Sequence, residues 1–291
     1  MHLRLFAAVF LVTSVLSVTA EAKTKVVASF SILGDMVEQV VGDLAEVETI
    51  VGPDADAHIY TPNVDDARAV ATADVIFTNG LGFETWSKTL IDTAGGKARV
   101  YVATKGVTPL KIDGEIDPHA WNALPSGMTY ISNIAEAMAE FDPANAAAYR
   151  ANASAYRAKL KALHEKALSS VAGLPADRRT VVTAHDAFGY LARAYGLEFL
   201  APVGIDTEAE PSARQLATLI TQLKEKQVAA LFVENITSPD LVKQISAETG
   251  LKIGGRLFSD ALSERGGPAT SYLAMFEHNL TTLLTALKPA M

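Results

Sequence analysis

The sequence of 291 residues contains no cysteine. It can therefore form no disulfide bond and offer no thiolate to a metal ion, which leaves histidine and the carboxylates as metal ligands. The usual bacterial lipid anchor is attached to a cysteine that follows the leader peptide. We therefore expect a released protein that has no lipid anchor.

Long apolar runs are also scarce, and the clearest one lies at the N-terminus. Residues 5–18 are almost wholly apolar, Arg4 precedes them, and the small-x-small triplet at 20–22 follows them. The run is too short to span a membrane, and it predicts a cleaved signal peptide at residues 1–22. No later segment reaches the ~18 apolar residues that a spanning helix needs. The predicted location is the periplasm.

Basic residues are fewer than acidic residues, 25 against 33, and the formal net charge is −8. Nucleic-acid binding depends on basic patches, so we expect no nucleic-acid partner. A mild negative charge needs no explanation beyond solubility. After removal of the leader, the chain length suits about two domains.

Apolar runs of strand length alternate with helical patterns through both halves of the chain. Strands are expected near residues 25–30, 47–51, 74–78, 99–103, 180–183, 197–203, 229–233 and 251–258. Helices are expected at residues 32–41, 65–73, 83–94, 126–140, 187–195, 212–226, 238–249 and 271–287. This alternation predicts parallel sheets with flanking helices. The expected fold class is α/β, with two similar lobes.

A long helical tract separates the two halves. Residues 144–171 are rich in Ala, Lys, Glu and Leu and contain neither Gly nor Pro. A helix of about this length spans ~40 Å. We expect a rigid backbone helix at 143–172 that joins an N-terminal lobe at 23–142 to a C-terminal lobe at 173–291. Such a helix predicts limited motion of the lobes.

Three histidines and one aspartate are the strongest candidates for chemistry. His58, His119, His185 and Asp260 lie far apart in the sequence, and each follows or lies close to an expected strand. In α/β folds the ends of strands form the ligand sites. Three neutral imidazoles and one carboxylate make a complete tetrahedral set for a zinc-like ion. The sequence therefore predicts a metal site.

Each of these residues also has a simpler interpretation. The segment of His58 could be a solvated acidic loop, and those of His119 and His185 could be a turn and a helix start. Asp260 could cap a turn. His164, inside the long helical tract, is interpreted as a surface residue. The same holds for His278 in the last helix.

Neighbouring residues could support such a site. Asp117 could orient the imidazole of His119, and Trp121 could form an apolar wall that keeps the ion's surroundings dry. Glu234 stands at the end of an expected strand, and its expected role is to support a ligand. The acidic residues of 206–210 are interpreted as a solvated loop.

The motifs around these residues resemble those of the cluster A-I metal-binding solute-binding proteins of ABC transporters, the zinc and manganese receptors. Five segments are similar to family motifs: 117–121 (Asp-Pro-His-Ala-Trp), 185–190 (His-Asp-Ala-Phe-Gly-Tyr), 210–212 (Glu-Pro-Ser), 232–234 (Phe-Val-Glu) and 259–262 (Ser-Asp-Ala-Leu). The resemblance extends over essentially the whole mature chain. It implies that the three histidines and the aspartate are the four ligands, in a cleft between two lobes joined by one backbone helix.

The resemblance also implies a function. The mature protein would capture a metal ion in the periplasm and deliver it to a membrane permease driven by an ATPase. A periplasmic metallochaperone that loads the site is a further candidate partner, and a monomer is expected.

The choice of metal depends on the third ligand. Manganese receptors of the family usually have a glutamate where this chain has His185, and imidazole suits zinc. The chain departs from the family pattern in two places. Residues 56–58 are Asp-Ala-His where Asp-Pro-His is more usual, so we expect a looser approach to His58. A long His-rich loop is missing, which weakens the zinc assignment. Zinc is therefore the prediction, and manganese is the alternative.

Two other classes of protein are less favoured. A zinc-dependent enzyme would need an open metal position, which Asp260 would close. Known hydrolase and nucleotide-binding motifs are also missing from the sequence. A scaffold that holds a metal only for structure would unfold without it, and two self-sufficient lobes argue against that. We expect no enzymatic activity.

Overall fold

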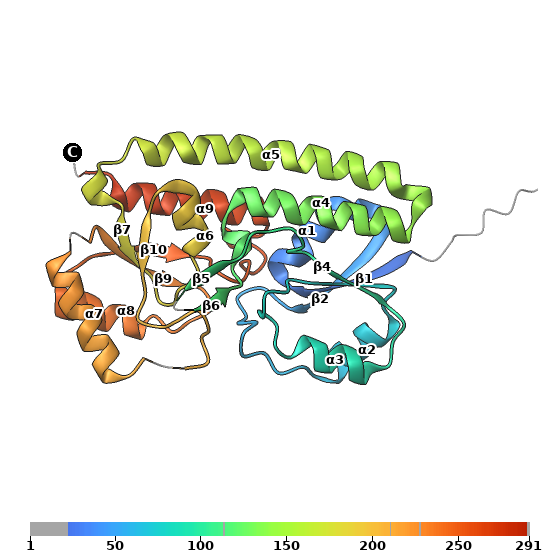
Figure 1. The fold of residues 1–291 in the computed structure, drawn as a ribbon, viewed down its shortest axis with the longest axis horizontal. Helices are drawn as coiled ribbons and strands as arrows, with labels where there is room; N and C mark the ends of the chain where they lie inside the picture. Colours follow the sequence, from blue (N-terminus) through green and yellow to red (C-terminus); the bar gives the residue numbers. More distant parts are fainter. Residues whose placement is uncertain (1–22, 113, 210, 227, 290–291) are drawn as a thin grey trace, which may run out of the picture.

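The computed structural model describes residues 23–112, 114–209, 211–226 and 228–289, so the expected signal peptide lies outside the described residues. Two four-stranded parallel sheets form two lobes (Figure 1). The N-terminal sheet has the order β2-β1-β3-β4 and contains β1 (Thr24–Phe30), β2 (Ala45–Val51), β3 (Val75–Thr78) and β4 (Arg99–Val102). The C-terminal sheet has the order β10-β9-β7-β8 and contains β7 (Thr180–Val182), β8 (Glu198–Leu200), β9 (Ala230–Glu234) and β10 (Ile253–Leu257).

The two sheets share one topology. In each lobe the first strand lies between the second and the third, and the fourth strand pairs with the third. The registers are parallel, for example Val26 beside both Val47 and Val75. The expectation of two similar α/β lobes is confirmed.

Helices flank both sheets (Figure 1). The N-terminal lobe contains α1 (Ser31–Val41), α2 (Val64–Thr72) and α3 (Ser87–Ala94). The C-terminal lobe contains α6 (Gly189–Tyr195), α7 (Ala213–Glu225), α8 (Asp240–Thr249) and α9 (Tyr272–Leu287).

Capping residues in the sequence determine where some of these helices begin. The side chain of Asn63 caps α2 and that of Ser212 caps α7, each in a reciprocal capping box. No helix in the described part of the chain has the length and apolarity to cross a membrane.

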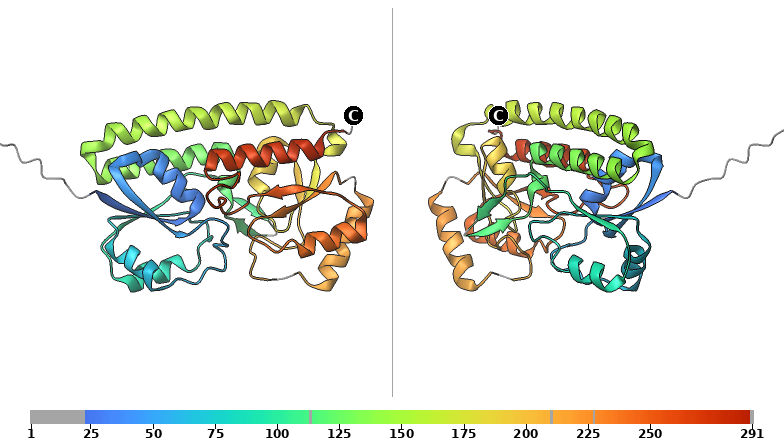
Figure 2. Two further views of the ribbon diagram at one scale, coloured as in Figure 1. Left: turned by 180° about the vertical axis from the view of Figure 1, so that it is seen from behind. Right: turned by 45° about the vertical axis from the view of Figure 1, so that its right-hand side comes forward.

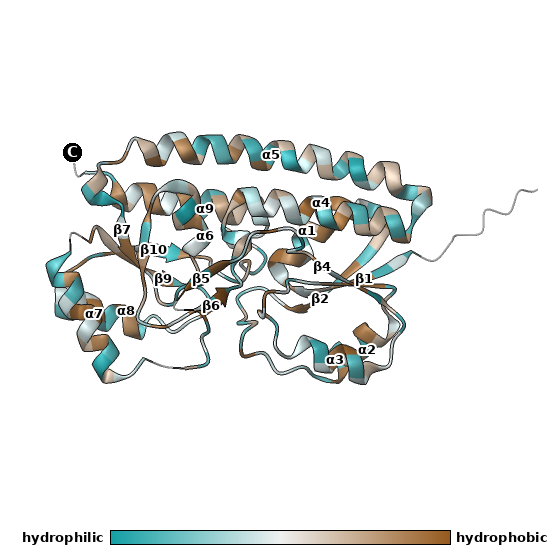
Figure 3. Ribbon diagram, in the orientation of Figure 1, coloured by the Kyte–Doolittle hydropathy of each residue, from teal (hydrophilic) through white to brown (hydrophobic). Residues whose placement is uncertain are grey.

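One long helix, α5 (Ala146–Ala172), joins the lobes and runs along α4 (Leu124–Phe141) and α9 (Figures 1 and 2). Its 27 residues correspond to a length of ~40 Å. A narrow buried stripe that includes Tyr149, Tyr156 and Leu160 holds it against both lobes, and its other faces mix hydrophilic and apolar residues (Figure 3). One large apolar core extends through both lobes beneath it, and a second, smaller apolar cluster lies in the C-terminal lobe. This shared core agrees with limited lobe motion.

A small antiparallel hairpin was not expected from the sequence. It consists of β5 (Leu110–Ile112) and β6 (Glu115–Asp117). The sequence does carry a hairpin signal at 110–117 (Leu-Lys-Ile-Asp-Gly-Glu-Ile-Asp), an Asp-Gly pair between two short runs that alternate apolar and polar residues. The expected alternation of strands and helices did not include it. The hairpin matters for the site, because β6 ends two residues before His119 and leads directly into it.

Candidate metal centre

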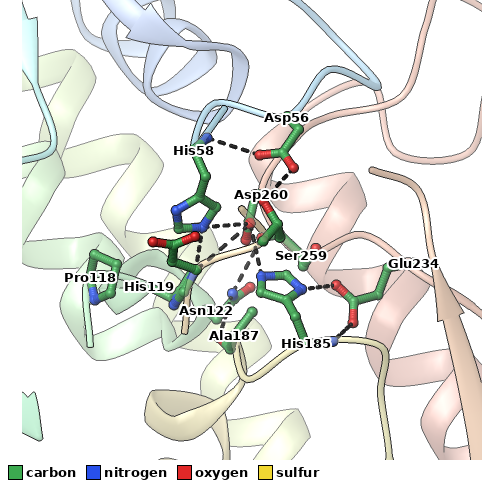
Figure 4. Close-up of polar contacts among 12 residues, drawn as sticks. Asp56, His58, Pro118, His119, Asn122, His185, Ala187, Glu234, Ser259 and Asp260 are labelled. Atoms are coloured by element: carbon green, nitrogen blue, oxygen red, sulfur yellow. Dashed lines mark hydrogen bonds and ion pairs between the residues drawn. The ribbon is translucent and has the colours of Figure 1, made fainter. Parts of the chain in front are cut away.

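The four predicted side chains converge from four separate segments (Figure 4). His58 lies in the loop that follows β2, and His119 lies between β6 and a short 3-10 turn at Ala120–Asn122. His185 follows β7 and Asp260 follows β10. One ligand-type atom from each side chain lies within 4.8 Å of all the others. Both lobes therefore contribute to one site at the ends of their strands.

Four of the six distances among these atoms are close to those around a tetrahedral ion. His58 Nε2 lies 3.1 Å from His119 Nε2. Asp260 Oδ2 lies 3.4, 3.7 and 3.0 Å from the Nε2 atoms of His58, His119 and His185. Four ligands at about 2.0–2.1 Å from a zinc ion have edges of about 3.3–3.4 Å between them. The residues present therefore fit a small four-coordinate cation.

The site is almost closed to solvent. His119, His185 and Asp260 are completely buried, and the side chain of His58 is only 6% exposed. Within the described part of the chain, His185 Nε2 and both carboxylate oxygens of Asp260 make no well-directed hydrogen bond. Buried polar atoms normally have partners. A bound cation would supply one to each of these atoms.

Two buried carboxylates orient two of the imidazoles. Asp117 Oδ1 lies 2.9 Å from His119 Nδ1 and also accepts the backbone N–H of His119. Glu234 Oε2 lies 2.6 Å from His185 Nδ1, while its Oε1 accepts the backbone N–H groups of Ala184 and His185. A proton held on Nδ1 leaves Nε2 free to face the site. The supporting positions expected for Asp117 and Glu234 agree with this geometry.

Burial and charge shift the pKa values within this cluster. Burial disfavours the charged imidazolium of His185, but the carboxylates of Glu234 and Asp260 outweigh it and raise its pKa well above 6.5. Burial dominates at His119 and lowers its pKa. Burial also acts on Asp260, where His185 and His119 outweigh it and hold the carboxyl pKa below its usual range. Without a cation, the site therefore favours a proton on His185.

Aromatic residues pack around the imidazoles. Trp121 lies 5.3 Å from His119 between ring centroids, and its Nε1 donates to the backbone oxygen of Ser259 at 2.7 Å. Phe83 lies 4.8 Å from the ring of His58 and 4.6 Å from that of Trp121. Trp121 therefore lies beside His119, and the apolar wall expected from it stays a prediction. Phe83 was missed, although it follows the end of β3 as the other candidates follow their strands.

Two other histidines, His164 and His278, lie away from this cluster. His164 Nδ1 lies 3.0 Å from the hydroxyl of Tyr195, and His278 Nε2 lies 3.1 Å from the backbone oxygen of Arg256.

Asn122 was not predicted, yet its side-chain amide donates to the backbone oxygens of Ala187 and Ser259. Nothing in the periodicity distinguishes such an amide from a surface one.

Two α/β lobes that enclose a buried set of ligand-type side chains define the class of two-lobed solute-binding proteins. The model of one family, the zinc-uptake complex component A periplasmic family (ZnuA), matches residues 26–286. The chain belongs to this family.

Individual relatives extend this picture. The chain is 35% identical to the iron-binding protein YfeA of Yersinia pestis over 268 residues, which cover 90% of this chain and 85% of that protein. It is 31% identical to the manganese ABC transporter substrate-binding lipoprotein PsaA of Streptococcus anginosus over 280 residues, 92% of this chain and 91% of that protein. The solved structure of the periplasmic zinc-binding protein TroA of Treponema pallidum superposes with a TM-score of 0.88 at 28% identity, covering 92% of this chain and all of that one.

The chain is thus a metal-binding substrate-binding protein of the ABC transporter type, which works outside the cytoplasmic membrane with a membrane permease and an ATPase. Members of the family are transport proteins and not enzymes. The three relatives are named for iron, manganese and zinc, so the family alone does not identify the cargo.

Proposed function

We propose that this protein captures Zn(II) through His58, His119, His185 and Asp260 and delivers it to an ABC importer. The observation that supports this best is the donor set itself. Three Nε2 atoms and one carboxylate oxygen lie within 4.8 Å of one another, and this set suits zinc better than a cation that prefers six oxygens. Imidazole-rich sites also bind zinc more tightly than manganese.

Manganese is the second candidate, and one observation favours it. Asp260 Oδ1 is buried and has no hydrogen-bond partner in the described part of the chain. Both oxygens of this carboxylate could therefore bind one ion and raise its coordination number to five. Manganese accepts more oxygen ligands than zinc, and several relatives are named for manganese.

We also propose where the protein is located and how its chain is organised. A signal peptide at 1–22 would be removed, and the mature chain would be released into the periplasm as a monomer. Some relatives are named lipoproteins, but this sequence offers no cysteine for a lipid. The proposed lobes are 23–142 and 173–291, joined by the helix at 143–172. A metallochaperone is a further candidate partner.

Metal analysis tests this proposal. The purified protein is expected to contain one zinc ion per chain, and zinc is expected to displace manganese in a competition assay. Substituting Asp260→Ala removes the fourth ligand, and we expect at least a tenfold loss of zinc affinity from the lost carboxylate. A variant that kept its full affinity would indicate an open three-histidine site. A preference for manganese would favour the second candidate.

A further inference from the structure

The four proposed ligands are not held equally firmly. Trp121 and Asn122, just after His119, both donate to the backbone oxygen of Ser259, which precedes Asp260. Asn122 also donates to the backbone oxygen of Ala187, two residues after His185. All three hydrogen bonds are buried. They lock the segments of His119, His185 and Asp260 into one unit, and His58 has no part in it.

The loop of His58 is held to the C-terminal lobe mainly by Asp54. The backbone N–H of Asp54 donates to the backbone oxygen of Leu262 at 2.8 Å. Its Oδ1 accepts from Asn235 Nδ2 at 2.9 Å, and its Oδ2 accepts from the backbone N–H of Glu264 at 3.2 Å. Both carboxylate oxygens of Asp54 therefore accept hydrogen bonds from groups of the C-terminal lobe.

These three contacts are made close to the other proposed ligands. Asn235 directly follows Glu234, which orients His185, and Leu262 lies two residues after Asp260. Asp54 itself lies four residues before His58. It therefore connects the His58 loop to the same segments that position the rest of the site.

The backbone of Asp54 indicates that this position is imposed. Its φ of +51° lies in the left-handed region, which non-glycine residues adopt uncommonly and at a cost. Such a conformation persists where surrounding contacts hold it. A second contact assists, because Asp56 Oδ2 accepts from Thr207 Oγ1 at 2.6 Å while Asp56 Oδ1 accepts the backbone N–H of His58.

We propose that Asp54 is a positioning residue that fastens the His58 loop to the C-terminal lobe and thereby sets the rate at which the metal ion leaves. This inference rests on the proposed function. The hydrogen bonds of the Asp54 side chain are exposed to water, whereas those among the other three segments are buried. His58 is also the only proposed ligand that is not fully buried. The His58 loop is therefore the part of the site that opens first.

Stopped-flow measurement of zinc transfer to excess chelator tests this inference. Asp54→Gly keeps the backbone N–H and tolerates the positive φ, but removes both side-chain contacts. We expect about a tenfold faster dissociation, since hydrogen bonds to a charged group are lost and such changes act mainly on dissociation. Asp54→Asn keeps one acceptor oxygen and should give a smaller increase. Asp92→Asn, an exposed neutralisation on α3, should leave the rate unchanged.

Hydrogen exchange of the metal-free protein gives an independent test. Asp54→Gly should speed exchange in residues 53–60 while the melting temperature of the metal-free protein stays close to that of the parent. Dissociation and loop exchange within twofold of the parent would overturn the inference. An equal effect of Asp54→Asn and Asp54→Gly that vanished at high salt would overturn it too, because it would indicate charge alone. If the parent bound no zinc, the proposed function would fail, and loop exchange would still decide the role of Asp54.

Discussion

Replacing Glu234 by Gln should weaken zinc binding although the two side chains have nearly the same shape. The Oε1 atom of the carboxylate accepts the backbone N–H groups of Ala184 and His185, and its Oε2 atom lies 2.6 Å from His185 Nδ1 as an ion pair. A glutamine has a single acceptor oxygen. Either orientation of its amide therefore points an NH2 group at a donor, or forces the His185 proton onto Nε2, where the ion would bind.

The expected loss of zinc affinity follows from the acceptor oxygen that the glutamine lacks. Substitutions of residues that orient a metal ligand typically reduce affinity about 10–100-fold, or roughly 1.4–2.8 kcal/mol. We expect the upper part of this range, because Glu234 and His185 are buried and water cannot replace the lost acceptor. The variant should also flatten the pH dependence near neutrality, since Glu234 is a main cause of the raised pKa of His185.

Asp117→Asn provides a matched comparison. Asp117 uses one oxygen, Oδ1, for both the backbone N–H and Nδ1 of His119, and an asparagine retains that oxygen. Its loss of affinity should be clearly smaller. Glu248→Gln, an exposed change on α8, serves as the control. Affinities would be measured by competition with a chromophoric chelator from pH 6 to pH 8.5. If Glu234→Gln bound zinc within twofold of the parent with the same pH profile, the proposed role of Glu234 would be wrong.

Two further outcomes are expected. The sequence predicts weaker zinc binding as the pH falls through about 6, and the raised pKa of His185 moves the onset of this loss above 6.5. The loss should reach up to about tenfold per pH unit while one proton competes with the ion. Constant affinity from pH 8 to pH 5, measured by calorimetry, would refute this expectation. Trp121→Phe removes the buried hydrogen bond to Ser259 and should lower the free energy of unfolding of the metal-free protein by about 1–3 kcal/mol in urea, whereas an unchanged midpoint would show that this bond contributes nothing.

Much of the fold could be predicted because its elements are long and periodic. The helices α1, which has an apolar stripe, and α5, whose tract lacks Gly and Pro, begin and end within a few residues of their expected bounds. The hairpin of β5 and β6 was missed although an Asp-Gly pair at 113–114 lies between two short alternating runs, which is a hairpin signal. Where the hairpin packs could not be predicted from this local pattern. Tyr190, for instance, accepts from Leu110 N and donates to the backbone oxygen of Asp117.

The candidate site was predictable where residue type alone suggests chemistry. Histidine is rare in this chain, so His58, His119 and His185 could be found from their places after strands. Asn122 and Asp54 could not, because their roles depend on which backbone groups of the other lobe lie beside them. Contacts between distant segments leave no local pattern in the sequence.

The central claim is that one zinc ion binds between the lobes to three imidazoles and one carboxylate. A crystal structure of the zinc-loaded protein, with anomalous data collected at the zinc edge, tests it most directly. We expect a single strong peak with the Nε2 atoms of His58, His119 and His185 and an oxygen of Asp260 at about 2.0–2.2 Å. A peak elsewhere, or one that any of the three imidazoles does not reach, would contradict it.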